Sequence, residues 1–134
     1  MSSSPDRPID REQIARLLTR HKDRMKLYLS HCMRCTLCAE SCFLYMSRGK
    51  DPRYMPSYKV INSVGVLYRK SARLEREDLE RMKGIVWRDC ALCTRCYCPV
   101  GVDVPGMIAF ARGVLRSQGI HPGFDEDGAM ESWL

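Results

Sequence analysis

Two runs of cysteines constrain this chain more than any other feature, because eight cysteines stand among only 134 residues. The runs are Cys32-x2-Cys35-x2-Cys38-x3-Cys42 and Cys90-x2-Cys93-x2-Cys96-x-Cys98, and Pro99 follows the second. The N-terminal residues contain no apolar segment of the kind that directs export, so we expect a cytoplasmic chain with reduced thiols. In that setting, clustered cysteines usually bind metal.

The spacing of the cysteines favours iron–sulfur clusters over zinc. Three cysteines separated by two residues each can wrap one cubane 4Fe-4S cluster, with each thiolate on a separate iron, and the fourth cysteine of such a run usually binds the other cluster. Structural zinc sites use paired Cys-x2-Cys knuckles, in which a third cysteine at the next x2 position has no role. A zinc-stabilised binding module remains the alternative from a different class.

We therefore predict two 4Fe-4S clusters with crossed ligands. One cluster takes Cys32, Cys35, Cys38 and Cys98, and the other takes Cys90, Cys93, Cys96 and Cys42. Crossing requires the two loops to lie side by side. The second run has one residue before its last cysteine where the standard run has three. We expect full ligation through a tighter turn, and the alternative is an incomplete, labile or three-iron site.

Apolar residues recur at helical spacing outside the cysteine runs, which predicts a mainly α protein. Helices are expected over residues 10–31, 60–68, 74–86 and 104–119, with a loop over 47–57. Asp10 and Asp103 are predicted to begin the first and last helices, and Gly119 to end the last. We expect the cluster loops to hold the helix pairs together with little core between these pairs, so removal of iron should unfold the domain.

The ends of the chain have a different composition from the middle. Residues 1–8 are predicted to be a flexible leader, residues 9–119 the two-cluster domain, and residues 120–134 an irregular tail. The tail keeps aromatic residues that suit an interface, so we expect it to dock on a partner through Phe124 and Trp133.

The basic composition carries little weight as a sign of nucleic-acid binding. The formal charge is +6. Eight thiolates would add about −8 and two oxidised cluster cores about +4, which leaves roughly +2. We predict no nucleic-acid partner. No apolar segment approaches the roughly 18 residues of a membrane span.

Two further segments carry a family resemblance. The first run is followed by Asp51-Pro52-x3-Pro56-x-Tyr58-Lys59, and the second ends in Cys-Pro-x-Gly-Val-Asp at residues 98–103. Over roughly residues 28–120 the chain resembles the C subunit of heterodisulfide reductase and related heterodisulfide-reductase-like electron-transfer subunits. The resemblance implies an α-helical ferredoxin fold, with helices flanking two cluster-binding loops.

The resemblance also implies a function and partners. The chain would be a non-catalytic electron-relay subunit of a larger redox complex, beside a flavin-containing subunit or one with a cysteine-rich catalytic domain. It has no Gly-rich dinucleotide motif of its own. Contact with a membrane would arise through such partners. The alternative is a free, diffusing dicluster ferredoxin.

Overall fold

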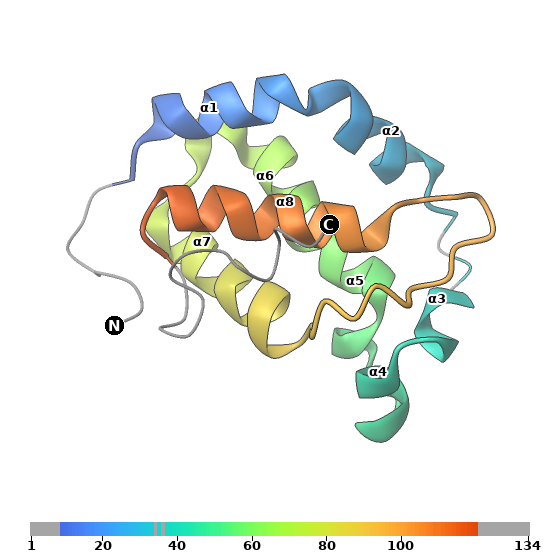
Figure 1. Cartoon of the computed structure of the whole chain (residues 1–134). Helices are drawn as coiled ribbons and strands as arrows, with labels where there is room; N and C mark the ends of the chain where they lie inside the picture. Colours follow the sequence, from blue (N-terminus) through green and yellow to red (C-terminus); the bar gives the residue numbers. More distant parts are fainter. Residues whose placement is uncertain (1–8, 34, 36, 121–134) are drawn as a thin grey trace.

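The fold is an assembly of helices (Figure 1), seen in a computed structural model that describes residues 9–33, 35 and 37–120. The described residues form helices and no strand, so the predicted mainly α class is confirmed. The helices are α1 (Arg11–Arg20), α2 (Lys22–His31), α3 (Leu37–Glu40), α4 (Phe43–Ser47), α5 (Pro56–Ile61), α6 (Val64–Lys70), α7 (Arg76–Lys83) and α8 (Val104–Ser117). Short turns are η1 (Pro52–Tyr54), η2 (Ser71–Arg73) and the π-helical η3 (Gly84–Arg88). The predicted leader and the tail anchors Phe124 and Trp133 lie outside the described residues.

Helix α8 begins and ends where the sequence predicts. The Asp103 carboxylate accepts a hydrogen bond of 3.0 Å from the Gly106 N–H and caps the first turn. Gly119 takes a positive φ of 74° after the last turn. The Ile120 N–H then donates to the Leu115 carbonyl at 3.0 Å, which closes the glycine-dependent helix end known as a Schellman motif.

The core lies around α8, which crosses the middle of the molecule (Figure 1) and contacts α1, α5, α6 and α7. Its face toward these helices carries Met107, Ile108, Ala111 and Leu115, each with an exposed fraction of 0%. Ile120, which the sequence analysis assigned to the tail, is also buried in this core. The expectation of little core between the helix pairs is therefore wrong, because the helices bury their apolar faces against α8.

Two predicted helices are interrupted. The helix expected over 10–31 breaks at His21, whose ring packs on Phe110 with the ring centroids 5.0 Å apart. The helix expected over 60–68 breaks after α5, where the Ser63 hydroxyl donates to the Lys59 carbonyl at 2.6 Å. Such side-chain bonds compete with the helical ladder. The predicted loop over 47–57 is partly helical, since η1 lies within it and Pro56 occupies the first position of α5.

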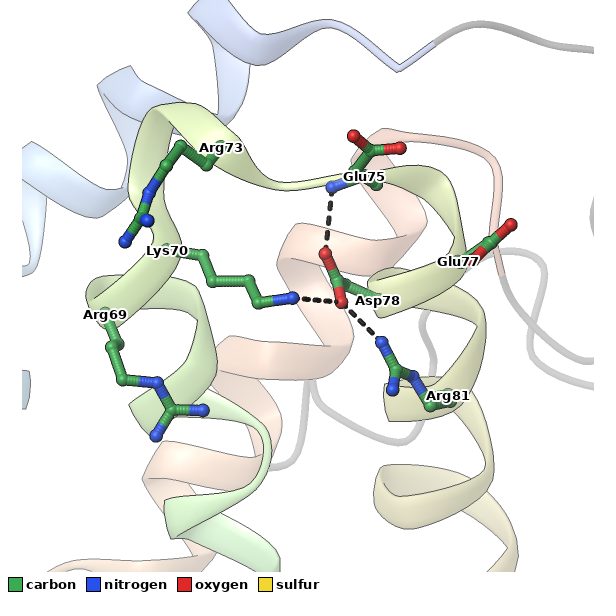
Figure 2. Close-up of a pocket in the computed structure, with 7 residues that line it drawn as sticks. All are labelled: Arg69, Lys70, Arg73, Glu75, Glu77, Asp78 and Arg81. Carbon is green, nitrogen blue, oxygen red and sulfur yellow. Dashed lines mark hydrogen bonds and ion pairs between the residues drawn. The ribbon is translucent and has the colours of Figure 1, made fainter.

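The turn between α6 and α7 is held by one buried carboxylate (Figure 2). Asp78 accepts hydrogen bonds from the Lys70 ammonium at 2.7 Å, the Arg81 guanidinium at 2.5 Å and the Glu75 N–H at 3.0 Å. Only 4% of its side chain is exposed. This turn lies at the end of the molecule away from the cysteine loops (Figure 1), so its role is to join the helices.

We expect Asp78→Asn to destabilise the α6–α7 turn, because the neutral amide cannot form charge-assisted hydrogen bonds with Lys70 and Arg81. Removing charge-assisted bonds to a buried group costs about 2 kcal/mol, which should lower the midpoint of thermal unfolding by roughly 5–10 °C. Glu77→Gln makes the same chemical change on an exposed neighbour that points away from the network (Figure 2), and it should leave the midpoint unchanged. Equal midpoints for both variants would contradict the assignment.

The same carboxylate makes stability depend on pH. The hydrogen bond from Lys70 holds the pKa of Asp78 below its ordinary value. The stabilisation is therefore fully present above the ordinary aspartate pKa and is lost as the pH falls through the lowered value. Asp78→Asn should remove this contribution, so that the free energy of unfolding measured against pH falls less steeply in acid for the variant than for the parent protein.

Two candidate iron–sulfur sites

The first candidate site is a cavity lined by thiols from both cysteine runs. Cys32 follows α2 and Cys38 lies in α3, while Cys98 comes from the segment before α8. Most of the other residues that line the cavity are apolar, among them Val60 of α5, and Ser57 is polar. The four thiols that line this cavity are Cys32, Cys35, Cys38 and Cys98.

The second cavity has the reciprocal composition. Cys42 precedes α4 and belongs to the first run, whereas the other three thiols come from the segment between η3 and α8. Phe43, Leu92 and Ile108 cover the walls. The four thiols that line it are Cys42, Cys90, Cys93 and Cys96. The tertiary structure thus brings together the same two sets of four cysteines that the cysteine spacing predicted.

The two cavities are neighbours, since the buried side chain of Val104 at the start of α8 lines both. A hydrogen bond also ties the loops together: the Tyr97 N–H donates to the Ser41 hydroxyl at 3.0 Å. Tyr97 stands between Cys96, which faces the second cavity, and Cys98, which faces the first. The single-residue spacing of the second run is therefore long enough to reach from one cavity to the other.

The backbone of the second run bends sharply around its cavity. Leu92 and Thr94, on either side of Cys93, have positive φ angles of 54° and 64°. A side-chain-bearing residue in this region costs about 1–2 kcal/mol, and such conformations persist where the surrounding structure demands them. The bends allow three thiols separated by two residues each to line one cavity. No glycine marks these positions, so sequence patterns did not predict them.

Burial shapes the chemistry of the thiols. It raises the pKa of Cys38 and of Cys90, and it raises the pKa of Cys96 to about 12, helped by the neighbouring Cys90 and Cys93. At Cys90 the positive charge of Lys59 opposes the effect of burial. These three thiols are protonated at neutral pH without metal, so iron displaces their protons when it binds.

Three polar residues support the sites and were not identified as site residues from the sequence. Lys59, 3% exposed, donates from Nζ to Cys42 Sγ at 3.5 Å. Ser57 hydrogen-bonds Cys38. Arg112, 1% exposed, donates to the carbonyls of Val86 and Cys90, each at 2.9 Å. The available signal was an arginine within the apolar stripe of α8, where a charge requires buried partners.

The donor set fits cubane clusters. None of the eight cysteines, all of which lie in the described part of the chain, forms a disulfide. Among the described residues, no three Cys, His, Asp or Glu side chains gather closely enough to share one metal ion. Four thiols spread around an apolar cavity instead suit a cluster in which each thiolate binds its own iron.

No helix in the described part of the chain has the length and hydropathy that a membrane span needs. Among known proteins, the chain is 32% identical to Hdr-like menaquinol oxidoreductase iron-sulfur subunit 2 of Archaeoglobus fulgidus over 124 aligned positions, which cover 79% of this chain and 22% of the relative. It is 31% identical to the Hdr-like menaquinol oxidoreductase iron-sulfur subunit of Archaeoglobus profundus over 121 positions, with the same coverage. The matched region therefore spans about a fifth of the length of these relatives. No solved structure matches the chain significantly.

Residues 28–102, more than half of the chain, match the family of 4Fe-4S dicluster domains. This range contains both cysteine runs and the helices between them. The chain therefore belongs to the 4Fe-4S dicluster family, and it is an electron-transfer domain for two 4Fe-4S clusters, with eight cysteines, related to the iron–sulfur subunits of Hdr-like oxidoreductases.

Proposed function

We propose that this chain is an electron-relay subunit of a heterodisulfide-reductase-like redox complex, with its clusters ligated across the two runs. The observation that carries the proposal is the composition of the two neighbouring cavities. Cys98 of the second run lines the first cavity, and Cys42 of the first run lines the second. Each cavity therefore offers four thiols, the number that a 4Fe-4S cluster requires.

The residues between and around the cavities suit an electron relay. When bound, a 4Fe-4S cluster accepts and returns one electron without a change of ligands. The buried residue Val104 lines both cavities, which places the two sites close together. Each site reaches the surface through the second cysteine of one run, since Cys35 and Cys93 are exposed. An electron could thus enter at one run and leave at the other.

Membership of a complex is supported by the relatives and by the surface near the sites. The relatives are named as iron–sulfur subunits of Hdr-like menaquinol oxidoreductases. Several large apolar side chains of the cysteine loops are exposed, among them Met33, Phe43 and Tyr97, as at surfaces that bind other proteins. We propose a flavin-containing subunit or a cysteine-rich-domain subunit as partner, and a cytoplasmic location with any membrane contact made through the partners.

Metal analysis and native purification test this proposal. The anaerobically purified chain should contain about eight iron atoms and a similar amount of sulfide. Purified from its native cell through a tag on this chain alone, it should bring a second redox subunit with it. A colourless zinc protein would contradict the cluster assignment. A fully loaded chain that purifies alone at native abundance would instead indicate a free ferredoxin.

A further inference from the structure

The geometry points to Lys59 as the residue that makes the reduction potentials of the two clusters unequal. We propose that its buried ammonium raises the potential of the second site, so that the first electron added to the protein resides there. This inference rests on the proposed crossed ligation, in which Cys42, Cys90, Cys93 and Cys96 hold the second cluster. It concerns one charge on α5, whose residues line both sites.

The surroundings of Lys59 require an anion. Its side chain lines the second cavity, and its Nζ donates to Cys42 Sγ at 3.5 Å. In the described part of the chain, no carboxylate forms an ion pair with it. A buried ammonium without a compensating charge is strongly unfavourable. The group that can balance it is the ligated thiolate of Cys42 together with the cluster that this thiolate holds.

Other charges near the second site do not cancel this positive charge. Asp89 is fully buried next to Cys90, but the Arg88 guanidinium pairs with it at 2.9 Å, so the pair is neutral. Arg112 lies behind Cys90 and donates to its carbonyl at 2.9 Å. The described groups therefore leave the second site in positive surroundings, and Lys59 is the one charged side chain among the described residues that line its cavity.

Among the described residues, the first site has no such cation. None of the described residues that line it carries a charged side chain. Its polar contact is neutral: Ser57 hydrogen-bonds the Cys38 sulfur. Hydrogen bonds from charged donors are roughly twice as strong as neutral ones. Ser57 and Lys59 both belong to α5, so one short helix gives a neutral donor to one site and a charged donor to the other.

The sign of the effect follows from charge. Reduction adds one negative charge to a cluster, and a nearby cation stabilises that reduced form more than the oxidised form. Net charge and hydrogen bonds to sulfur are among the factors that set cluster potentials. The second site should therefore be reduced first. An electron delivered to the first site would then move toward the second spontaneously.

A redox titration of the fully loaded protein, followed by EPR, tests the inference. Lys59→Met should shift the potential of one signal to a lower value and leave the other unchanged. The shifted signal should be the one that Cys93→Ser removes. Lys59→Arg keeps the charge and should restore the original value. Lys26→Met makes the same substitution at an exposed position of α2, and both potentials should stay as in the parent protein.

The possible outcomes separate this inference from the proposed function. Unchanged potentials in Lys59→Met, equal shifts of both signals, or a shift of the signal that Cys35→Ser removes would each overturn it. If the Lys59→Met protein does not take up iron, Lys59→Gln replaces it in the redox titration. If neither variant holds the second cluster while Lys59→Arg does, Lys59 is an assembly residue and the inference is rejected. A parent protein without two clusters would instead refute the proposed function.

Discussion

Cys98→Ser is expected to remove the same EPR signal as Cys35→Ser, although the two residues belong to different runs. Both thiols line the first cavity, with Cys98 crossing to it past Tyr97. Loss of either ligand should leave one intact cluster, so iron should fall from about eight to about four atoms per chain, or to about seven if a three-iron form survives. Iron analysis and EPR of the reduced protein measure both effects.

The matched control for this crossing is Cys42→Ser. Cys42 lines the second cavity, so Cys42→Ser should remove the same EPR signal as Cys93→Ser. Together, the two results would show that each run gives its fourth cysteine to the cluster held by the other run. If Cys98→Ser matched Cys93→Ser instead, each run would hold its own cluster. That result would refute the crossed ligation and, with it, the assignment of Lys59 to the second site.

Removal of iron is expected to unfold the cysteine loops while most of the helical core remains. Met107, Ala111 and Leu115 of α8 are fully buried without lining either cavity, and burial of a large apolar side chain contributes about 1.5–3 kcal/mol to folding. Cys90 belongs to that core, Cys96 and Cys98 pack against it as partly buried side chains, and the other five cysteines are not members of it. We expect the helical circular dichroism to decrease modestly, and amide protons to lose protection only in the two loops, α3 and α4.

The experiment is chelation under reducing, anaerobic conditions, followed by hydrogen exchange. A sample treated with chelator that is already saturated with iron serves as the control. Amides of α8 should keep the protection that reflects a stable core. A cooperative loss of all helical signal would contradict this expectation, because it would mean that the clusters rather than the contacts of α8 hold the helices together.

The chemistry of the sites could be predicted from local spacing. A thiolate run with x2 gaps has few uses, so the two cysteine runs indicated the clusters without knowledge of the fold. The ends of α8 were also predictable, because Asp103 and Gly119 act on hydrogen-bonding groups only a few residues away. Where residues satisfy their partners locally, sequence is sufficient.

Boundaries inside the helical segments could not be predicted in this way. The break at His21 accompanies the packing of its ring on Phe110, which is distant in sequence. The extent of the core was also underestimated, because the apolar faces of α1, α5, α6 and α7 meet only when all of them pack on α8. Periodicity marks an apolar face but does not say which partner will cover it.

The sequence by itself determined that this protein carries two clusters, since thiol number and spacing are properties of the chain. Only the tertiary structure decided which charges face them. Lys59 is separated from Cys42 by 17 residues and Arg112 from Cys90 by 22, and no local pattern brings them together. Burial beside a sulfur, rather than residue type, makes Lys59 different from every exposed lysine of the described chain, because a charge acts strongly only where water is excluded.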